Sequence, residues 1–99
     1  MVALVWSPRA TIELNEIAEY VAMDSPMYSR SIVERFILRA SLLPEQPGQG
    51  RRVPGYVGPR DMHEVFVHRW RMIYSVSAEA VEIVTILHGA RLIENAPPL

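Results

Sequence analysis

The chain has 99 residues, enough for one domain with a single hydrophobic core, and 49% of them are apolar while 21% are charged. A formal net charge of −1 disfavours general nucleic-acid binding, and the absence of cysteine excludes disulfides and thiol chemistry. No apolar run approaches the roughly 20 residues that span a bilayer, and the N-terminus lacks a signal-peptide pattern. We therefore expect a cytoplasmic protein without a membrane segment. The three histidines lack metal-ligand spacing, and we expect neither a metal nor a cofactor.

The first third of the chain predicts a strand and then two helices. Val2–Trp6 is apolar on both faces, which favours a strand in an interior or covered position of a sheet. Ser7-Pro8 and Ser25-Pro26 each combine an N-cap residue with proline at the first helical position. The first helix fades at Met23-Asp24, and the second runs to about Leu43, before a proline. Two helices joined so closely form an antiparallel hairpin.

Each predicted helix has an apolar stripe that would face a sheet. The stripes are Ala10, Leu14, Ile17, Ala18 and Val21 in the first helix, and Ile32, Val33, Phe36, Ile37, Ala40 and Leu43 in the second. Some apolar residues miss both stripes or lie at their edges, namely Ile12, Tyr20, Met27, Leu38 and Leu42. These residues predict a protein-binding surface on the hairpin, although single exposed apolar residues are also common and need no such function.

The segment Glu45–Arg60 holds four of the five glycines and three of the eight prolines. This composition predicts a loop or a weak edge strand, and it carries Arg51, Arg52 and Arg60. Loops of this length in small domains are usually functional or mobile.

The last third, Asp61–Arg91, is dense in β-branched and aromatic residues and predicts three strands. They lie near Met62–Val67, Arg69–Val76 and Val81–Leu87, with Ser77–Ala80 as the second turn. Alternation places Trp70, Met72, Tyr74 and Val76 on one face of the middle strand. In the last strand it places Val81, Ile83, Thr85 and Leu87 on one face, opposite Glu82, Val84, Ile86 and His88. A strand that is apolar on both faces is expected to be central in its sheet.

The predicted fold class is α+β, in a single domain over residues 1–99. An N-terminal strand joins a mainly antiparallel sheet that a C-terminal three-stranded meander completes, and the two-helix antiparallel hairpin packs on one face. The opposite face is expected to meet water or a partner.

Five short motifs form a recognisable pattern along the chain: Trp6-Ser7-Pro8-Arg9-Ala10, Val53-Pro54-Gly55-Tyr56, His63-Glu64-Val65-Phe66-Val67, Trp70-Arg71-Met72-Ile73-Tyr74 and Ile86-Leu87-His88-Gly89-Ala90-Arg91. Together they resemble the RelE/ParE superfamily of type II toxin–antitoxin toxins, over about residues 2 to 92. The chain resembles ParE more closely, through its HGAR ending and short tail. ParE-like sequences often place glycine or asparagine before the W/Y-R pair. Val67-His68-Arg69-Trp70 has neither, so we expect a longer or shifted turn.

The resemblance implies one of two activities, and the fold alone does not choose between them. RelE-like members cut mRNA in the ribosomal A site, whereas characterised ParE-like members poison DNA gyrase and block replication. The absence of lysine and the net charge of −1 are unfavourable for ribosome binding and favour the ParE side. We therefore expect a gyrase inhibitor that is not itself an enzyme. The alternatives are a ribosome-dependent mRNA endonuclease and a degenerate toxin that only binds its antitoxin.

The resemblance also suggests roles for individual residues. Arg71 and Arg91 match arginines that hold the scissile phosphate in RelE-like nucleases, where His88 would be the base with Glu64 beside it. In the structural alternative, the arginines pair with Glu64 or Glu82, and His88 is a polar residue at a strand end. For contact with the target, the candidates are Trp70, Arg71, His88 and Arg91.

The partner implied by the resemblance is a cognate antitoxin, whose C-terminal segment wraps around the toxin. All ten basic residues are arginine, which either reflects codon usage or provides guanidinium forks for carboxylates or phosphates. Arg35 and Arg39 repel each other one helical turn apart, so an acidic partner group is expected nearby. The candidate antitoxin-binding residues are Ile12, Tyr20, Met27, Arg35, Leu38, Arg39 and Leu42.

Overall fold

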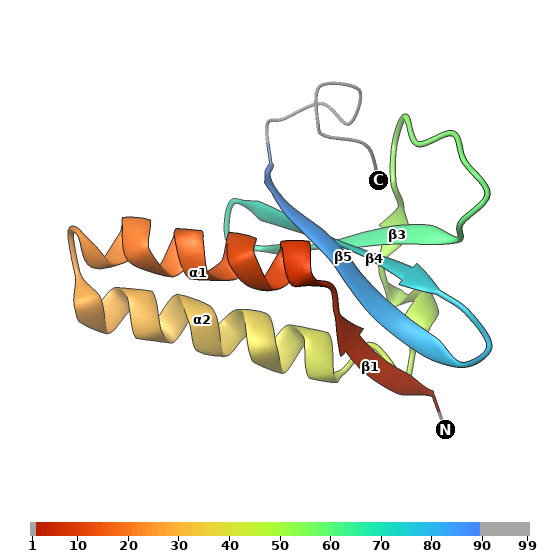
Figure 1. Ribbon diagram of the computed structural model, residues 1–99, viewed down its shortest axis with the longest axis horizontal. Helices are drawn as coiled ribbons and strands as arrows, with labels where there is room; N and C mark the ends of the chain where they lie inside the picture. The colour runs from red at the N-terminus through yellow and green to blue at the C-terminus, as the bar shows by residue number, and fades with distance from the viewer. Residues whose placement is uncertain (1, 90–99) are drawn as a thin grey trace.

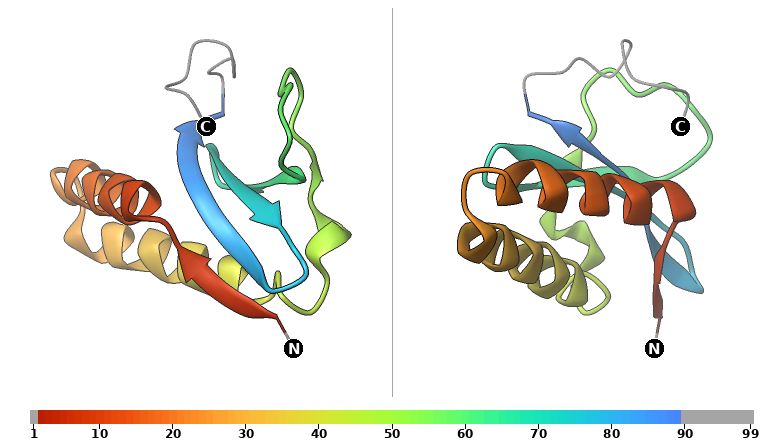
Figure 2. Two further views of the ribbon diagram at one scale, coloured as in Figure 1. Left: turned by 45° about the vertical axis from the view of Figure 1, so that its right-hand side comes forward. Right: turned by 60° about the vertical axis from the view of Figure 1, so that its left-hand side comes forward.

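A computed structural model describes residues 2–89 and confirms the α+β class (Figure 1). The elements in chain order are β1 (Ala3–Trp6), α1 (Pro8–Ala22), α2 (Pro26–Ser41), the 3-10 turn η1 (Pro47–Gln49), β2 (Arg51–Arg52), β3 (Met62–Val67), β4 (Trp70–Val76) and β5 (Ala80–His88). They form a five-stranded sheet in the order β1-β5-β4-β3-β2, in which β1 is parallel to β5 and the other pairs are antiparallel. The α1–α2 hairpin covers one face of this sheet (Figure 2).

Both helices begin at the predicted N-caps. The Ser7 hydroxyl accepts a hydrogen bond from Ala10 N at 3.0 Å, and the Ser25 hydroxyl accepts one from Tyr28 N at 3.1 Å. Each cap satisfies one of the backbone N–H groups that a helix start leaves without an intrahelical partner. Among the described residues, neither helix is long and apolar enough to cross a bilayer.

The main core lies between the hairpin and the sheet. It contains most of both predicted stripes together with residues of β3, β4 and β5, including Ile17, Val21, Ile32, Phe36, Met72, Tyr74, Val81 and Ile83. The prediction for Ile37 is wrong, because its side chain is 53% exposed. Successive helical residues are rotated by about 100°, so a helix that directs Phe36 and Ala40 at the sheet turns Ile37 away from it.

Strand β1 lies at an edge of the sheet, which corrects the predicted interior or covered position (Figure 2). Leu4 and Trp6 pack against the main core, whereas the side chain of Val5 is exposed. Strand β1 therefore packs only one face against the core. Within the described chain, no other strand pairs with its outer edge.

Strand β5 lies between β1 and β4 and is not an edge strand, as predicted, but a bulge changes which of its side chains share a face. Tyr74 pairs with Ile83 while the preceding Ile73 pairs with Thr85, so Val84 is an extra residue in β5. One extra residue reverses the alternation beyond it. Ile86 therefore belongs to the main core and Leu87 to the opposite face, and the predicted faces of these two residues were wrong.

The opposite face of the sheet has a smaller core of its own. Val53, Met62, Ile73, Val84 and Leu87 are buried there, and Tyr56 packs against them. The loop that follows β2 crosses this face, on the side away from the helices (Figure 2). The chain itself therefore covers part of the face that was expected to meet water or a partner.

The loop is held in place by a turn and by polar contacts. Tyr56 N donates to Val53 O at 3.3 Å, and Gly55 has a φ of 81°, which fits a type II turn with proline before the glycine. The side chain of Arg60 donates to Ser75 Oγ at 2.7 Å and also contacts Glu82. In addition, Arg60 N donates to the Tyr56 hydroxyl at 3.3 Å.

The β3–β4 turn has only two residues, His68 and Arg69, so the expected longer or shifted turn was wrong. His68 adopts the positive φ, 53°, that the tight turn requires. Histidine is among the non-glycine residues that enter this backbone region most readily.

Candidate functional site

A buried ion pair joins β3 to β4. Glu64 is 1% exposed and Arg71 is 5% exposed. Arg71 Nε lies 2.8 Å from Glu64 Oε1, and Arg51 Nε lies 2.6 Å from Glu64 Oε2. Both carboxylate oxygens therefore have guanidinium partners, which offset the cost of burying a charge.

The register of the sheet separates Arg71 from His88. Arg71 pairs with Leu87 and lies on the face of the smaller core, whereas Trp70 pairs with His88 and packs toward the helices. Glu64 pairs with Ile73, so it is not beside His88. The structure thus brings together two of the four candidate target-contact residues, Trp70 and His88, and pairs Arg71 with Glu64 elsewhere. The fourth candidate, Arg91, lies outside the described residues.

Trp70 and His88 belong to a cleft between α1 and the β3–β4 turn, which we call the aromatic cleft. It consists of two adjoining depressions of about 470 and 420 Å³. Its lining includes Glu16, Tyr20, Asp24, Tyr28, His68, Arg69, Trp70 and His88. Tyr20, predicted to contact the antitoxin, is 71% exposed and lies here with two of the target-contact candidates.

A second surface lies between α2 and the edge of β3, and we call it the arginine groove. Its volume is about 290 Å³, and its lining residues are Arg35, Leu38, Arg39, Leu42, Phe66, Val67 and His68. Within the described part of the chain no acidic residue lines this groove, and Leu38 is 62% exposed. The guanidinium of Arg51 lies 5.5 Å from the centre of the Phe66 ring, which adds a further cation beside the groove.

The arginine groove brings together four of the seven predicted antitoxin contacts: Arg35, Leu38, Arg39 and Leu42. Ile12 and Met27 are exposed on the helices and line neither the aromatic cleft nor the arginine groove. Sequence analysis missed Phe66, although the alternation of β3 separates it from its buried neighbours Val65 and Val67.

Hydrogen bonds fix the polar side chains of the arginine groove. Arg35 Nη1 donates to His68 Nε2 at 2.6 Å, which requires this ring nitrogen to be unprotonated. Arg39 donates to the side-chain oxygen of Gln49, and Gln49 Nε2 donates to Leu42 O at 3.2 Å. The guanidinium groups are therefore oriented by neutral partners, and their charges are not compensated within the groove.

Beside the arginine groove, the edge of β3 is only partly covered. Strand β2 contributes two residue pairs, Arg51 with Glu64 and Arg52 with His63. Within residues 2–89, no strand pairs with the outer edge of β3 from Val65 to Val67. An extended partner segment can add a strand at such an edge.

Tyr74 holds the segment that carries Arg51. Its hydroxyl donates to Pro47 O at 2.6 Å and accepts from Gly50 N at 3.0 Å. A Cβ on Gly50 would lie 2.5 Å from this hydroxyl oxygen and 2.6 Å from Glu64 O, so the close approach requires glycine. Burial raises the pKa of the Tyr74 phenol above its ordinary value of 10.0.

His63 adds a second connection to the same segment. Its ring stacks on Tyr74 with centroids 5.6 Å apart, and its two nitrogens lie 3.2 Å from Gly50 O and 2.8 Å from Asp61 Oδ1. Among the described residues, the His, Asp and Glu side chains form no group of three that could hold a metal ion.

A helical hairpin on one face of a small mixed sheet is also the fold of two solved structures. A chain of the chromosomal ParDE TA system from P. aeruginosa has a TM-score of 0.74 at 20% identity, with 89% of this chain and 96% of that chain covered. The YoeB dimer from Staphylococcus aureus has a TM-score of 0.59 at 14% identity, with 88% and 95% covered.

The chain belongs to the family of ParE toxins of type II toxin-antitoxin systems, parDE, whose model matches residues 4–93. It is also 33% identical over 92 residues to Toxin RelE2 of Caulobacter vibrioides, and this match covers 93% of this chain and 100% of that protein. The protein is therefore the toxin of a type II system, and an antitoxin is its partner.

Proposed function

We propose that this toxin inhibits DNA gyrase and blocks replication, and that its antitoxin binds at the arginine groove. The observation that carries the gyrase assignment is the buried pair of Arg71 with Glu64, on the face of the sheet opposite His88.

A phosphate-cleaving site needs an accessible cation and a base within reach of the same phosphate. Arg71 is 5% exposed, and it would have to leave Glu64 in order to bind a phosphate. Removing one partner of a buried ion pair typically costs about 3–5 kcal/mol. The base candidate His88 projects from the other face, so these two side chains do not converge on one phosphate.

Charge supports the same assignment. A protein that binds ribosomal RNA and mRNA neutralises many phosphates, and its affinity rests on counterion release. This chain has a net charge of −1 and no lysine. Its cations are arginines, and two of them, Arg51 and Arg71, pair with one buried carboxylate.

The arginine groove fits an acidic amphipathic segment of the antitoxin. The exposed side chains of Leu38, Leu42 and Phe66 would receive apolar residues, and fully burying each of them is worth about 1.5–3 kcal/mol. Arg35 and Arg39 would meet carboxylates of the partner. The open edge of β3 next to the groove would accept an extended stretch that follows a helix.

The gyrase proposal is tested with purified toxin, gyrase and relaxed plasmid. Toxin in excess is expected to inhibit supercoiling or to stabilise cleaved DNA, and preincubation with the antitoxin is expected to restore supercoiling. Unaltered supercoiling at toxin excess, with protein that arrests growth when induced in cells, would rule gyrase out as the target.

A ribosome-dependent mRNA endonuclease is the second candidate, supported by the 33% identity to Toxin RelE2. It predicts codon-positioned cuts in translated mRNA after induction. His88→Ala is the cleaner test of this candidate because His88 is exposed, whereas Arg71→Ala also opens a buried ion pair. Intact transcripts in primer extension would exclude this activity.

A further inference from the structure

The aromatic cleft has a chemistry unlike that of the arginine groove. The rings of Tyr20, Tyr28 and Trp70 line it, together with the carboxylates of Glu16 and Asp24. Within residues 2–89, neither carboxylate forms an ion pair. Both residues are exposed.

This combination of aromatic rings and carboxylates favours the binding of a cation. The face of an aromatic ring carries negative potential and attracts ammonium and guanidinium groups within about 6 Å. The carboxylates add formal negative charge, and the same charge repels phosphate groups. Arg69 contributes one positive charge on the wall that the two depressions share, so the lining residues within 2–89 include two carboxylates and one guanidinium.

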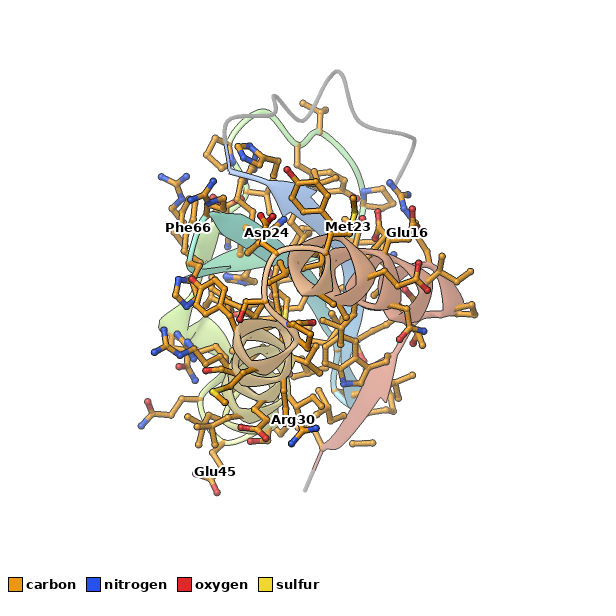
Figure 3. The ribbon with its side chains drawn as sticks, turned by 90° about the vertical axis from the view of Figure 1, so that its left-hand side faces the viewer. Glu16, Met23, Asp24, Arg30, Glu45 and Phe66 are labelled. Carbon is orange, nitrogen blue, oxygen red and sulfur yellow. The ribbon has the colours of Figure 1, made fainter. Side chains whose placement is uncertain are left out.

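The two surfaces have opposite charge and meet at His68, which lines both. Figure 3, which faces the end of the hairpin, places Phe66 of the groove and Glu16 of the cleft on opposite sides, with Asp24 between them. An acidic segment suited to Arg35 and Arg39 would be repelled at the cleft. The cleft therefore fits a different partner.

We infer that the aromatic cleft binds arginine or lysine side chains on a basic segment of the toxin's target protein. The cation lies against the ring of Trp70 or Tyr20, with Asp24 or Glu16 as its counter-ion. This assignment rests on the proposed function only in requiring a protein target, and it does not require that target to be gyrase. It places the target and the antitoxin on separate surfaces of the toxin.

The first test measures binding of an arginine side chain by NMR, with N-acetyl-arginine methylamide titrated into the isotope-labelled toxin. The indole N–H signal of Trp70 is expected to shift, and Asp24→Asn is expected to weaken the response. N-acetyl-glutamate methylamide is the matched control ligand. An arginine probe that leaves the Trp70 signal unmoved, or moves it no more than the glutamate probe does, would overturn the inference.

The second test separates the two surfaces in cells and in vitro. The double variant Glu16→Arg, Asp24→Arg is expected to lower growth arrest at least about tenfold, because each substitution places a cation where the partner's cation binds. Its affinity for the antitoxin is expected to stay within about twofold of the parent, since charge changes outside an interface have small effects. Glu45→Arg is the control, a charge reversal of the same kind at an exposed residue that lines neither surface.

The outcomes distinguish this inference from the proposed function. Circular dichroism and thermal melting first establish that each variant is folded. Full toxicity of the folded double variant, or an equal loss of antitoxin affinity, would contradict the cleft assignment. Growth arrest that depends on Asp24 and Glu16 without gyrase inhibition would instead remove gyrase and leave the cleft assignment standing.

Discussion

Glu13 of α1 accepts a hydrogen bond from the backbone N–H of Ile86 at 3.0 Å, so a helix side chain closes the edge of β5 beyond the end of β1. The same carboxylate oxygen accepts from Thr85 Oγ1 at 2.6 Å. Ser7 Oγ donates to Val84 O at 2.8 Å just before these residues. The start of α1 thus provides the hydrogen bonds that a longer β1 would have made.

Glu13→Ala is expected to destabilise the toxin by about 1–3 kcal/mol, because it leaves Ile86 N and Thr85 Oγ1 without their acceptor. Urea unfolding followed by circular dichroism measures the change. Glu19→Ala, at an exposed position of the same helix, is the control and should change stability by less than about 0.5 kcal/mol. Equal effects of the two variants would show that the β5 edge does not need Glu13.

Arg71→Ala is expected to destabilise the fold by about 3–5 kcal/mol, because Glu64 would keep a buried charge with one partner fewer. The double variant Glu64→Leu, Arg71→Met is expected to recover most of this loss, since no unpaired buried charge remains. Arg52→Ala is the control, because the Arg52 side chain is 83% exposed. If Arg71→Ala were as stable as the control and still folded, the structural role of this pair would be wrong.

Tyr74→Phe is expected to cost about 1–3 kcal/mol at neutral pH, because Gly50 N and Pro47 O lose their partner. The pH dependence follows from the raised pKa of the phenol. Above pH 10.0 the unfolded chain loses this proton before the folded protein does. The contribution of the Tyr74 hydroxyl to folding stability is therefore fully present below that pH and declines as pH rises.

Difference spectra of the parent and Tyr74→Phe at 295 nm, recorded against pH, isolate the ionisation of this one phenol. Its midpoint is expected above 10.0 in the folded protein. A midpoint at or below that value would contradict the role of burial. Unfolding experiments at alkaline pH should show the parent losing its advantage over the variant.

Leu38→Glu is expected to weaken antitoxin binding by at least about thirtyfold, the loss typical of a central interface residue. The physical reasons are the lost apolar contact and a new negative charge opposite an acidic segment. Calorimetry with the folded variant measures the affinity. Ile12→Glu introduces the same charge on α1 outside the groove and is expected to have a smaller effect. Equal losses would extend the interface over α1, and parental affinity of Leu38→Glu would exclude the groove.

Local signals in the sequence predicted most of the elements. Serine followed by proline marked both helix starts, and the period-two pattern located β3 and β4 to within one residue at each end. These signals succeed because caps, proline and alternation act on a few neighbouring residues. They also predicted four residues of the arginine groove, since apolar residues and like charges on one helix face are visible in the sequence.

Only the tertiary structure decided which side chains meet across the sheet. The bulge at Val84 exchanged the faces of Ile86 and Leu87, and no residue in this stretch indicates a bulge. The pairing of Arg71 with Glu64 and the separation of Arg71 from His88 depend on the register between strands, which joins residues far apart in the chain. The sequence by itself determined the elements and the family pattern, because those follow from local chemistry. The division of the surface into an arginine groove and an aromatic cleft arises from packing, because each draws its lining from both the hairpin and the sheet.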